Sequence, residues 1–269
     1  MRRFVLSGTF SLLILLLTGQ VAFAQASASS QPPVRDPQAF ALLQASATAM
    51  AASTPSDSVA TGSVTLVAGS STDQGTIRIL TKGNAETAVQ VQTTSGSSWA
   101  VTYSNALASR TDGTTTKSLY LEQAASSRCI YFPYPVIADL LTNPDAAFTY
   151  VGLETSGQGS LQHIQAWNTF NSNPPFQFLA SFTVMDIWLD ATSGLPREIS
   201  FIHRDGGGSA PKIPITVFYS NYQNANGALY PYLIQQTVNG TLWATVTIQS
   251  VIFNAGLSDT NFAVAAEAN

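Results

Sequence analysis

The sequence predicts an α+β domain built on an antiparallel sheet, and three observations indicate this class. A helical stripe of apolar residues comes before a long series of short period-two runs. Turns containing Gly, Asn and Ser separate those runs, as is typical of neighbouring antiparallel strands. A second helical segment, near residue 134, interrupts the series. A chain of 269 residues fits one large domain of this class.

The first helix is expected to begin at Asp36-Pro37, which supplies an N-cap followed by a proline at the first helical position. It is expected to end near Ser53, before Pro55. Apolar residues follow the cap at helical spacing, namely Phe40, Leu43, Ala47 and Met50. This apolar stripe requires a sheet to pack on.

A meander of strands is predicted between residues 58 and 121. The runs that indicate it are rich in β-branched residues or alternate with period two, and they are 64–67, 76–80, 88–92, 99–103 and 117–121. Residues 134–141 (YPVIADLL) are predicted to form the second helix, which Asn143-Pro144 ends.

The second half of the chain has the clearest strand pattern, with strands predicted at 181–190, 196–203, 213–222, 230–237 and 241–253. Asn239-Gly240 is a two-residue hairpin signal, and this turn is preferred over a glycosylation site for Asn239-Gly240-Thr241. On the last strand, alternation places one set of residues on one face, namely Leu242, Ala244, Val246, Ile248 and Ile252. The opposite face is predicted to carry Trp243, Thr245, Thr247 and Gln249.

The N-terminal segment has the pattern of a secretory signal peptide. Arg2 and Arg3 precede an apolar run at 4–17, and small residues lead to a predicted cleavage between Ala24 and Gln25. The alternative is an uncleaved anchor, but this run is shorter than the roughly 20 residues that span a bilayer. No later stretch is long enough to span one. We therefore expect a periplasmic or secreted protein with a signal peptide at 1–24, a tether at 25–35, one domain at 36–264 and a tail at 265–269.

The composition excludes several function classes. Only 10% of the residues are charged and the net charge is −4, whereas a nucleic-acid binder needs a basic face. A single cysteine, Cys129, and two histidines rule out a disulfide framework and a cysteine-based zinc site. The sequence contains no nucleophile-elbow or zinc-protease motif, and the glycines at 206–208 lack the Lys-Ser/Thr of a phosphate loop. No cofactor and no metal are expected.

The two histidines are the acid/base candidates that remain. Nothing adjacent in the sequence to His163 supplies a partner, and His203 is interpreted as part of a solvated tip at 204–212. Asp186 and Asp190 would share one face of a strand about 13 Å apart, which is too far for a glycosidase pair. Asp190 is better interpreted as a turn former. The sequence therefore favours binding over catalysis.

The C-terminal half, residues 181–264, resembles the LolA/LolB/RseB-like proteins, which are periplasmic lipoprotein carriers and sensors. Ile187-Trp188-Leu189-Asp190 is followed by Gly194-Leu195-Pro196, and a later strand is entered through Asn226-Gly227 and Pro231. The chain closes with Asn254, Asp259 and Phe262 after a final strand. Segments 157–175 and 204–212 are extra to this pattern. The resemblance implies a strongly curved half-barrel in which an N-terminal helix and a helical insert cover the concave side.

In the carriers of this family the concave face and the helices line an apolar cavity that takes the acyl chains of lipoproteins. The resemblance therefore implies a non-enzymatic carrier or binding protein for a hydrophobic or amphipathic ligand, such as a lipid or lipid-modified protein. The cavity-lining candidates are Phe182, Ile187, Leu189, Ile199, Phe201, Val217, Tyr219, Ile234, Val246 and Ile248. The alternative for these residues is plain core, and strand parity does not say which face is concave.

Two other function classes stay open from the sequence. One is an envelope interaction or sensor module that recognises a protein partner with the same sheet. The other is an enzyme of unidentified class, which would require His163 or His203 to meet a carboxylate or hydroxyl in a cleft. The oligomeric state is not indicated by any pattern in the sequence.

Overall fold

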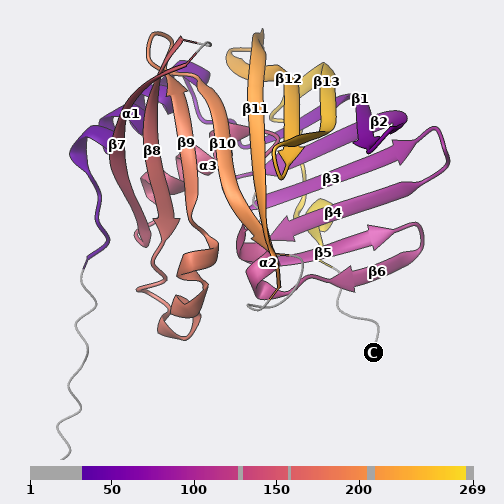
Figure 1. The fold of residues 1–269 in the computed structure, drawn as a ribbon, viewed down its shortest axis with the longest axis horizontal. Helices are drawn as coiled ribbons and strands as arrows, with labels where there is room; N and C mark the ends of the chain where they lie inside the picture. The colour runs from indigo at the N-terminus through magenta and orange to yellow at the C-terminus, as the bar shows by residue number, and fades with distance from the viewer. Residues whose placement is uncertain (1–31, 127–129, 157–158, 205–209, 265–269) are drawn as a thin grey trace, which may run out of the picture. The chain divides into compact units, whose positions relative to one another are not determined.

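The computed structural model describes residues 32–126, 130–156, 159–204 and 210–264. The predicted signal peptide, Cys129, the glycines at 206–208 and the tail at 265–269 lie outside these residues. The described residues form one antiparallel sheet of thirteen strands in the order β6-β5-β4-β3-β2-β1-β13-β12-β11-β10-β9-β8-β7. The sheet is open and curved, and β3–β6 cross the view of Figure 1 in a different direction from β7–β11. The predicted half-barrel is confirmed.

The first half of the domain comprises a helix, a meander and two further helices. The elements are α1 (Pro37–Met50), β1 (Asp57–Ala68), β2 (Ser71–Lys82), β3 (Glu86–Thr93), β4 (Ser98–Ser104), β5 (Leu107–Asp112), β6 (Thr115–Ser118), α2 (Leu121–Ser126) and α3 (Pro133–Thr142). The first helix begins where the cap predicts, since the Asp36 carboxylate accepts from the amides of Gln38 and Ala39 at 2.8 and 3.0 Å. The strand predicted at 117–121 is wrong in its bounds, because β6 ends at Ser118 and Leu121 already belongs to α2.

The second half adds seven strands and two 3-10 helices. The elements are β7 (Ala146–Ser156), β8 (Gly159–Asn168), η1 (Pro174–Phe182), β9 (Met185–Asp190), β10 (Pro196–Arg204), β11 (Lys212–Ala225), β12 (Ala228–Val238), β13 (Thr241–Phe253) and η2 (Asp259–Phe262). The strand predicted from residue 181 begins only at Met185, so Phe182 lies on η1 and not on a strand. The segment 157–175, expected to be extra to the family pattern, contains strand β8 of the sheet and the start of η1.

The segment before α1 is attached to the domain, whose compact unit begins at Pro32. The backbone of Val34 and Asp36 pairs with Phe148 on β7, with N···O distances of 2.9 and 3.1 Å. The Arg35 guanidinium donates to the carbonyls of Leu140 and Leu141 at 3.0 and 2.9 Å. These contacts satisfy two carbonyls at the C-terminal end of α3, which is a favourable place for a cation.

Pairing of β1 with β13 joins the first and last strands of the chain. The pairing contains a bulge between Thr61 and Gly62. A Cβ at position 62 would lie 2.2 Å from the Thr247 carbonyl oxygen, so only glycine allows the two backbones to approach this closely. The strands of the two halves thereby form one continuous sheet.

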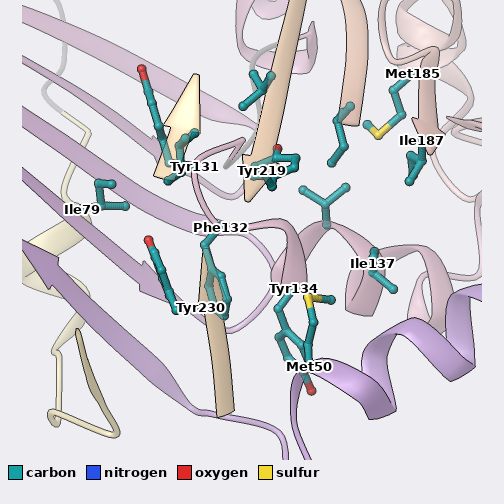
Figure 2. Packing of buried hydrophobic residues seen from close by; sticks show 14 of the residues in the cluster. Met50, Ile79, Tyr131, Phe132, Tyr134, Ile137, Met185, Ile187, Tyr219 and Tyr230 are labelled. Atoms are coloured by element: carbon teal, nitrogen blue, oxygen red, sulfur yellow. The ribbon is translucent and has the colours of Figure 1, made fainter. Parts of the chain in front are cut away.

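The core lies on the inner face of the sheet, where α1 and α3 pack. Leu43 and Met50 of α1 and Ile137 of α3 are buried against inward-facing residues of the strands. Phe132, just before α3, stacks on Tyr230 of β12 with ring centroids 4.5 Å apart (Figure 2). The predicted arrangement of helices over the concave side is confirmed.

The predicted faces of β13 need a correction. Ala244, Val246 and Ile248 are buried, but Leu242 and Ile252 are 38% and 52% exposed. The register shifts between Gln236 and Thr237 of β12, where two residues of β13 oppose one of β12, and again beside Thr61 of β1. A bulge inserts a residue and so reverses the parity of the side chains beyond it.

Candidate functional site

An apolar cavity of about 310 Å³ lies on the inner face of the half-barrel. Strands β3–β5 supply one wall and strands β10–β13 supply the other. The segment before α3 contributes Ile130 and Tyr131. The volume is at the lower end of the roughly 300–1,000 Å³ that small-molecule pockets occupy. The curvature of the sheet creates the site, because it brings strands distant in sheet order to opposite walls.

Aromatic and aliphatic side chains make up most of the walls. Trp99 and Tyr103 alternate along β4 with Val101 between them, and they face Phe201 of β10 and Trp243 of β13. Trp243 is the extra residue of the β12–β13 bulge. Its ring therefore turns to the inner face, although alternation along β13 predicts the opposite face. Bulges commonly redirect a side chain in this way. The cavity therefore presents large, rigid apolar surfaces to a ligand.

A few polar groups are placed among these rings. Arg110 binds the Asp112 carboxylate through Nε and Nη2 at 2.8–3.0 Å, and its guanidinium lies 5.2 Å from the centre of the Trp99 ring. The hydrogen bond from Arg110 lowers the pKa of the Asp112 carboxyl. The buried Tyr131 hydroxyl donates to the Gln236 side chain at 3.1 Å. An apolar pocket with a few convergent polar groups is the usual form of a ligand site.

The structure brings together nine of the ten cavity-lining candidates. Residues Ile187, Leu189, Ile199, Phe201, Val217, Tyr219, Ile234, Val246 and Ile248 all belong to one buried cluster on the inner face. Phe201 also lines the cavity, whereas Phe182 lies apart, with the Arg204 guanidinium 5.1 Å from its ring centre. The other eight are core residues of the inner face and are not among the residues that line the cavity.

His203 departs from the expected solvated tip. It is half-buried and lines the cavity near the end of β10. Strand parity could have indicated this position, since residue 203 shares a face with Phe201. The residues Trp99, Val101 and Tyr103 were detectable as an alternating run, but nothing local assigns them to the same cavity as β10. Trp243 has no local signal, because the bulge that turns it is set by pairing with β12.

A polar cluster occupies the outer face of β7–β9, on the other side of the sheet. His163 lies between Glu154 and Asp186, with Nδ1···Oε1 and Nε2···Oδ1 distances of 2.6 and 2.9 Å. Its ring stacks on Trp188 with centroids 4.3 Å apart. The sequence showed no partner for His163 because both carboxylates come from neighbouring strands.

The electrostatics of this cluster extend to β10. The hydrogen bond from Trp188, followed by that from His163, lowers the pKa of the Glu154 carboxyl. Burial raises the pKa of the Glu198 carboxyl, and the charge of Glu154 raises it further. The two carboxylates and the Trp188 ring together fix the orientation of the His163 imidazole on the outer face.

No group of three or more His, Cys, Asp or Glu side chains in the described part of the chain has the arrangement of a metal site. Across the same residues, no helix combines the length and the apolar character that a bilayer-spanning helix requires.

Comparisons with known proteins identify the architecture. No protein-family model matches the sequence, and no curated protein matches it. Among solved structures, a LolA superfamily protein from Nitrosomonas europaea superposes with a TM-score of 0.56 at 14% identity, over 83% of this chain and 96% of that one. This chain has the LolA-like fold.

Two further solved structures agree with the LolA-like fold. An outer membrane lipoprotein-sorting protein domain from Vibrio parahaemolyticus matches with a TM-score of 0.56 at 13% identity, over 83% of this chain and 95% of that one. A DUF1329 family protein from Desulfovibrio piger matches with a TM-score of 0.57 at 10% identity, over 85% of this chain and 98% of that one. The predicted resemblance is confirmed at the level of the fold, and the cavity lies on the concave side of this LolA-like half-barrel.

Proposed function

We propose that this chain is an exported, non-enzymatic protein that holds a hydrophobic or amphipathic ligand, such as a lipid or the acyl part of a lipid-modified protein, in its inner cavity. The apolar, aromatic-walled cavity of about 310 Å³ is the observation that carries this proposal. Burial of an acyl chain is favourable by about 0.8 kcal/mol per CH₂. A cavity with apolar walls can therefore bind such a chain without any catalytic group.

The polar groups of the cavity fit the head of an amphipathic ligand. Arg110 is held in place by Asp112 and Trp99, and His203 lies on the facing strand β10. In this proposal Phe201 contacts the ligand directly, while the other inward-facing candidates shape and support the wall. The expected signal peptide at 1–24, with cleavage between Ala24 and Gln25, and the LolA-like fold support a periplasmic or secreted location.

The test uses the full chain after export and a fluorescent fatty acid as the probe. Val101 lines the cavity, so Val101→Trp should fill it and abolish uptake. Val151→Trp makes the same chemical change at a side chain that is 54% exposed on β7, and it should bind like the unaltered protein. Circular dichroism and thermal unfolding establish that both variants are folded.

Mass spectrometry of lipid extracted from the purified protein provides an independent measurement. Co-purified lipid that is lost in Val101→Trp supports the proposal. Absence of co-purified lipid together with absence of fatty-acid uptake would overturn it, as would equal uptake by the unaltered protein and a folded Val101→Trp variant.

A further inference from the structure

A second depression of about 520 Å³ lies on the outer face of the sheet, over β1–β5 and β13. Its lining includes Arg78 of β2 and Gln90 of β3, which alternate with the core residues Ile77, Ile79, Val89 and Val91. The depression is therefore separated from the inner cavity by the thickness of the sheet. Trp99 of β4 contributes to the lining of both, while Arg78 and its polar neighbours line the outer depression and not the inner cavity.

Arg78 is the charged residue in this lining, and no aspartate or glutamate of the described residues lines it. Within the described part of the chain, the half-buried Arg78 guanidinium makes no hydrogen bond and no ion pair. Its neighbours across the strands are the uncharged Thr61 and Gln90. A guanidinium offers five N–H donors in a rigid fork. Because the Arg78 guanidinium has no partner among the described residues, these donors are available to an anionic ligand.

Neutral polar side chains surround the guanidinium. Thr76 of β2 and Gln249 of β13 join Thr61 and Gln90 in the lining, and within the described residues none of these four side chains forms a hydrogen bond to another protein group. Amide and hydroxyl groups both donate and accept hydrogen bonds. They match a ligand rich in hydroxyl groups.

The depression continues along the sheet. An adjoining depression of about 460 Å³ shares Thr76 and Gln92 with the first and extends over Ser63, Thr65 and Gln74. Together the two form an elongated trough lined mainly by Thr, Ser, Gln and Arg residues, longer than a single small anion would fill. Each volume lies within the roughly 300–1,000 Å³ of known ligand pockets. The shape therefore favours an extended ligand built of several polar units.

We propose that this trough binds an acidic oligosaccharide, a short chain of sugar units that carry carboxylates. Arg78 pairs with one carboxylate of the sugar chain in the bidentate geometry that guanidinium groups adopt. The amides of Gln90 and Gln249 and the hydroxyls of Thr61 and Thr76 bind the sugar hydroxyls. This site is distinct from the lipid cavity, and the two ligands can be bound at the same time.

Calorimetric titration of the full chain with tetragalacturonate tests the proposal, with maltotetraose and inorganic phosphate as comparison probes. Tetragalacturonate should bind, and both comparison probes should bind at least about tenfold more weakly, because each lacks one of the two recognised features. Arg78→Gln should weaken tetragalacturonate binding roughly tenfold or more. Lys117→Gln removes the same charge from the exposed face of β6, outside the trough, and should leave the affinity unchanged.

Three results would overturn the proposal. They are the absence of tetragalacturonate binding at millimolar concentration, equal affinity for either comparison probe, and an Arg78→Gln variant that is folded and binds like Lys117→Gln. Fatty-acid uptake measured on the same samples reports on the inner cavity alone. Failure of the oligosaccharide proposal is thereby distinguished from failure of the lipid proposal.

Discussion

The Nδ1 atom of His163 lies 2.6 Å from Oε1 of Glu154 on the neighbouring strand. The Trp188 indole stacks on the imidazole and donates to the other Glu154 oxygen at 2.9 Å. Strands β7, β8 and β9 are thus connected through side chains on their outer face as well as through backbone pairing. Because β7 is an end strand of the sheet, this network fixes a strand that has pairing on one side only over most of its length.

Replacement of Glu154 by Gln should destabilise the domain at neutral pH. Trp188 and then His163 lower the pKa of the Glu154 carboxyl below its ordinary 4.5, so the charged form stabilises the folded state above pH 4.5 and this contribution is lost as the pH falls below it. The side chain is half exposed, so we expect a loss of a few tenths to about 1 kcal/mol. Urea unfolding at pH 7 and in acid measures it.

The control for Glu154→Gln is the same substitution in a Trp188→Phe background, which already lacks the indole donor to Glu154. The loss at pH 7 should be smaller in that background, because the two side chains act in one network. A Glu154→Gln variant with unaltered stability at pH 7 would show that the network contributes nothing to folding.

Replacement of Glu198 by Gln should have the opposite sign. Burial and the charge of Glu154 raise the pKa of the Glu198 carboxyl above 4.5, so ionisation opposes folding, and stability falls as the pH rises from 4.5 through the folded-state pKa. We expect Glu198→Gln to stabilise by up to about 1 kcal/mol at pH 7 and to have no effect in acid. The gain should shrink in a Glu154→Gln background, because the repulsion is already gone. Destabilisation by Glu198→Gln at pH 7 would contradict this account.

Gly62→Ala should be among the most damaging substitutions in β1. The added Cβ would lie 2.2 Å from the Thr247 carbonyl oxygen, and a backbone atom cannot rotate away, so we expect a loss of about 3 kcal/mol or more. Gly69→Ala is the control, since φ is +61° there but no atom lies within 4 Å. Its strain should cost about 1 kcal/mol. Denaturant midpoints rank the two variants, and equal losses would show that the bulge relaxes.

Asp57→Ala should release the C-terminal segment from the outer face of β1–β3. The buried carboxylate accepts from the amides of Ala255 and Gly256 at 2.6 and 3.2 Å, and Phe262 is then placed in a small cluster with Leu80. Loss of a buried acceptor costs about 1–3 kcal/mol. Hydrogen exchange of residues 255–257 should accelerate.

Asp259→Ala is the control for Asp57→Ala. Asp259 is exposed and pairs with Lys82, and such surface pairs contribute little to stability. If Asp259→Ala accelerated exchange as much as Asp57→Ala, the salt bridge and not the buried carboxylate would hold this segment.

Local signals predicted the elements that depend on local chemistry. The Asp36 cap begins α1, and Asn239-Gly240 forms the turn before β13 with φ values of 50° and 75°. Asp190 accepts from the amides of Thr192 and Ser193 at 3.1 and 2.8 Å, as expected of a turn former. In each case the interacting atoms lie within a few residues of one another, so the sequence pattern contains the whole interaction.

The candidate site was predicted in part. Phe201 follows from strand alternation and the family resemblance, since both place it on the inner face. Trp243 and the partners of His163 do not follow from any local pattern. A bulge against β12 turns Trp243 inward, and the pairing of β7, β8 and β9 brings Glu154 and Asp186 to His163.

The sequence by itself determined the α+β class, the position of the first helix and the hairpin strands of the C-terminal half. Only the tertiary structure decided which strands meet across the cavity, which outer-face residues surround Arg78, and where bulges reverse the alternation. The physical reason is range. Propensity, capping and turn chemistry act over a few residues, whereas register and curvature depend on packing between strands far apart in the chain.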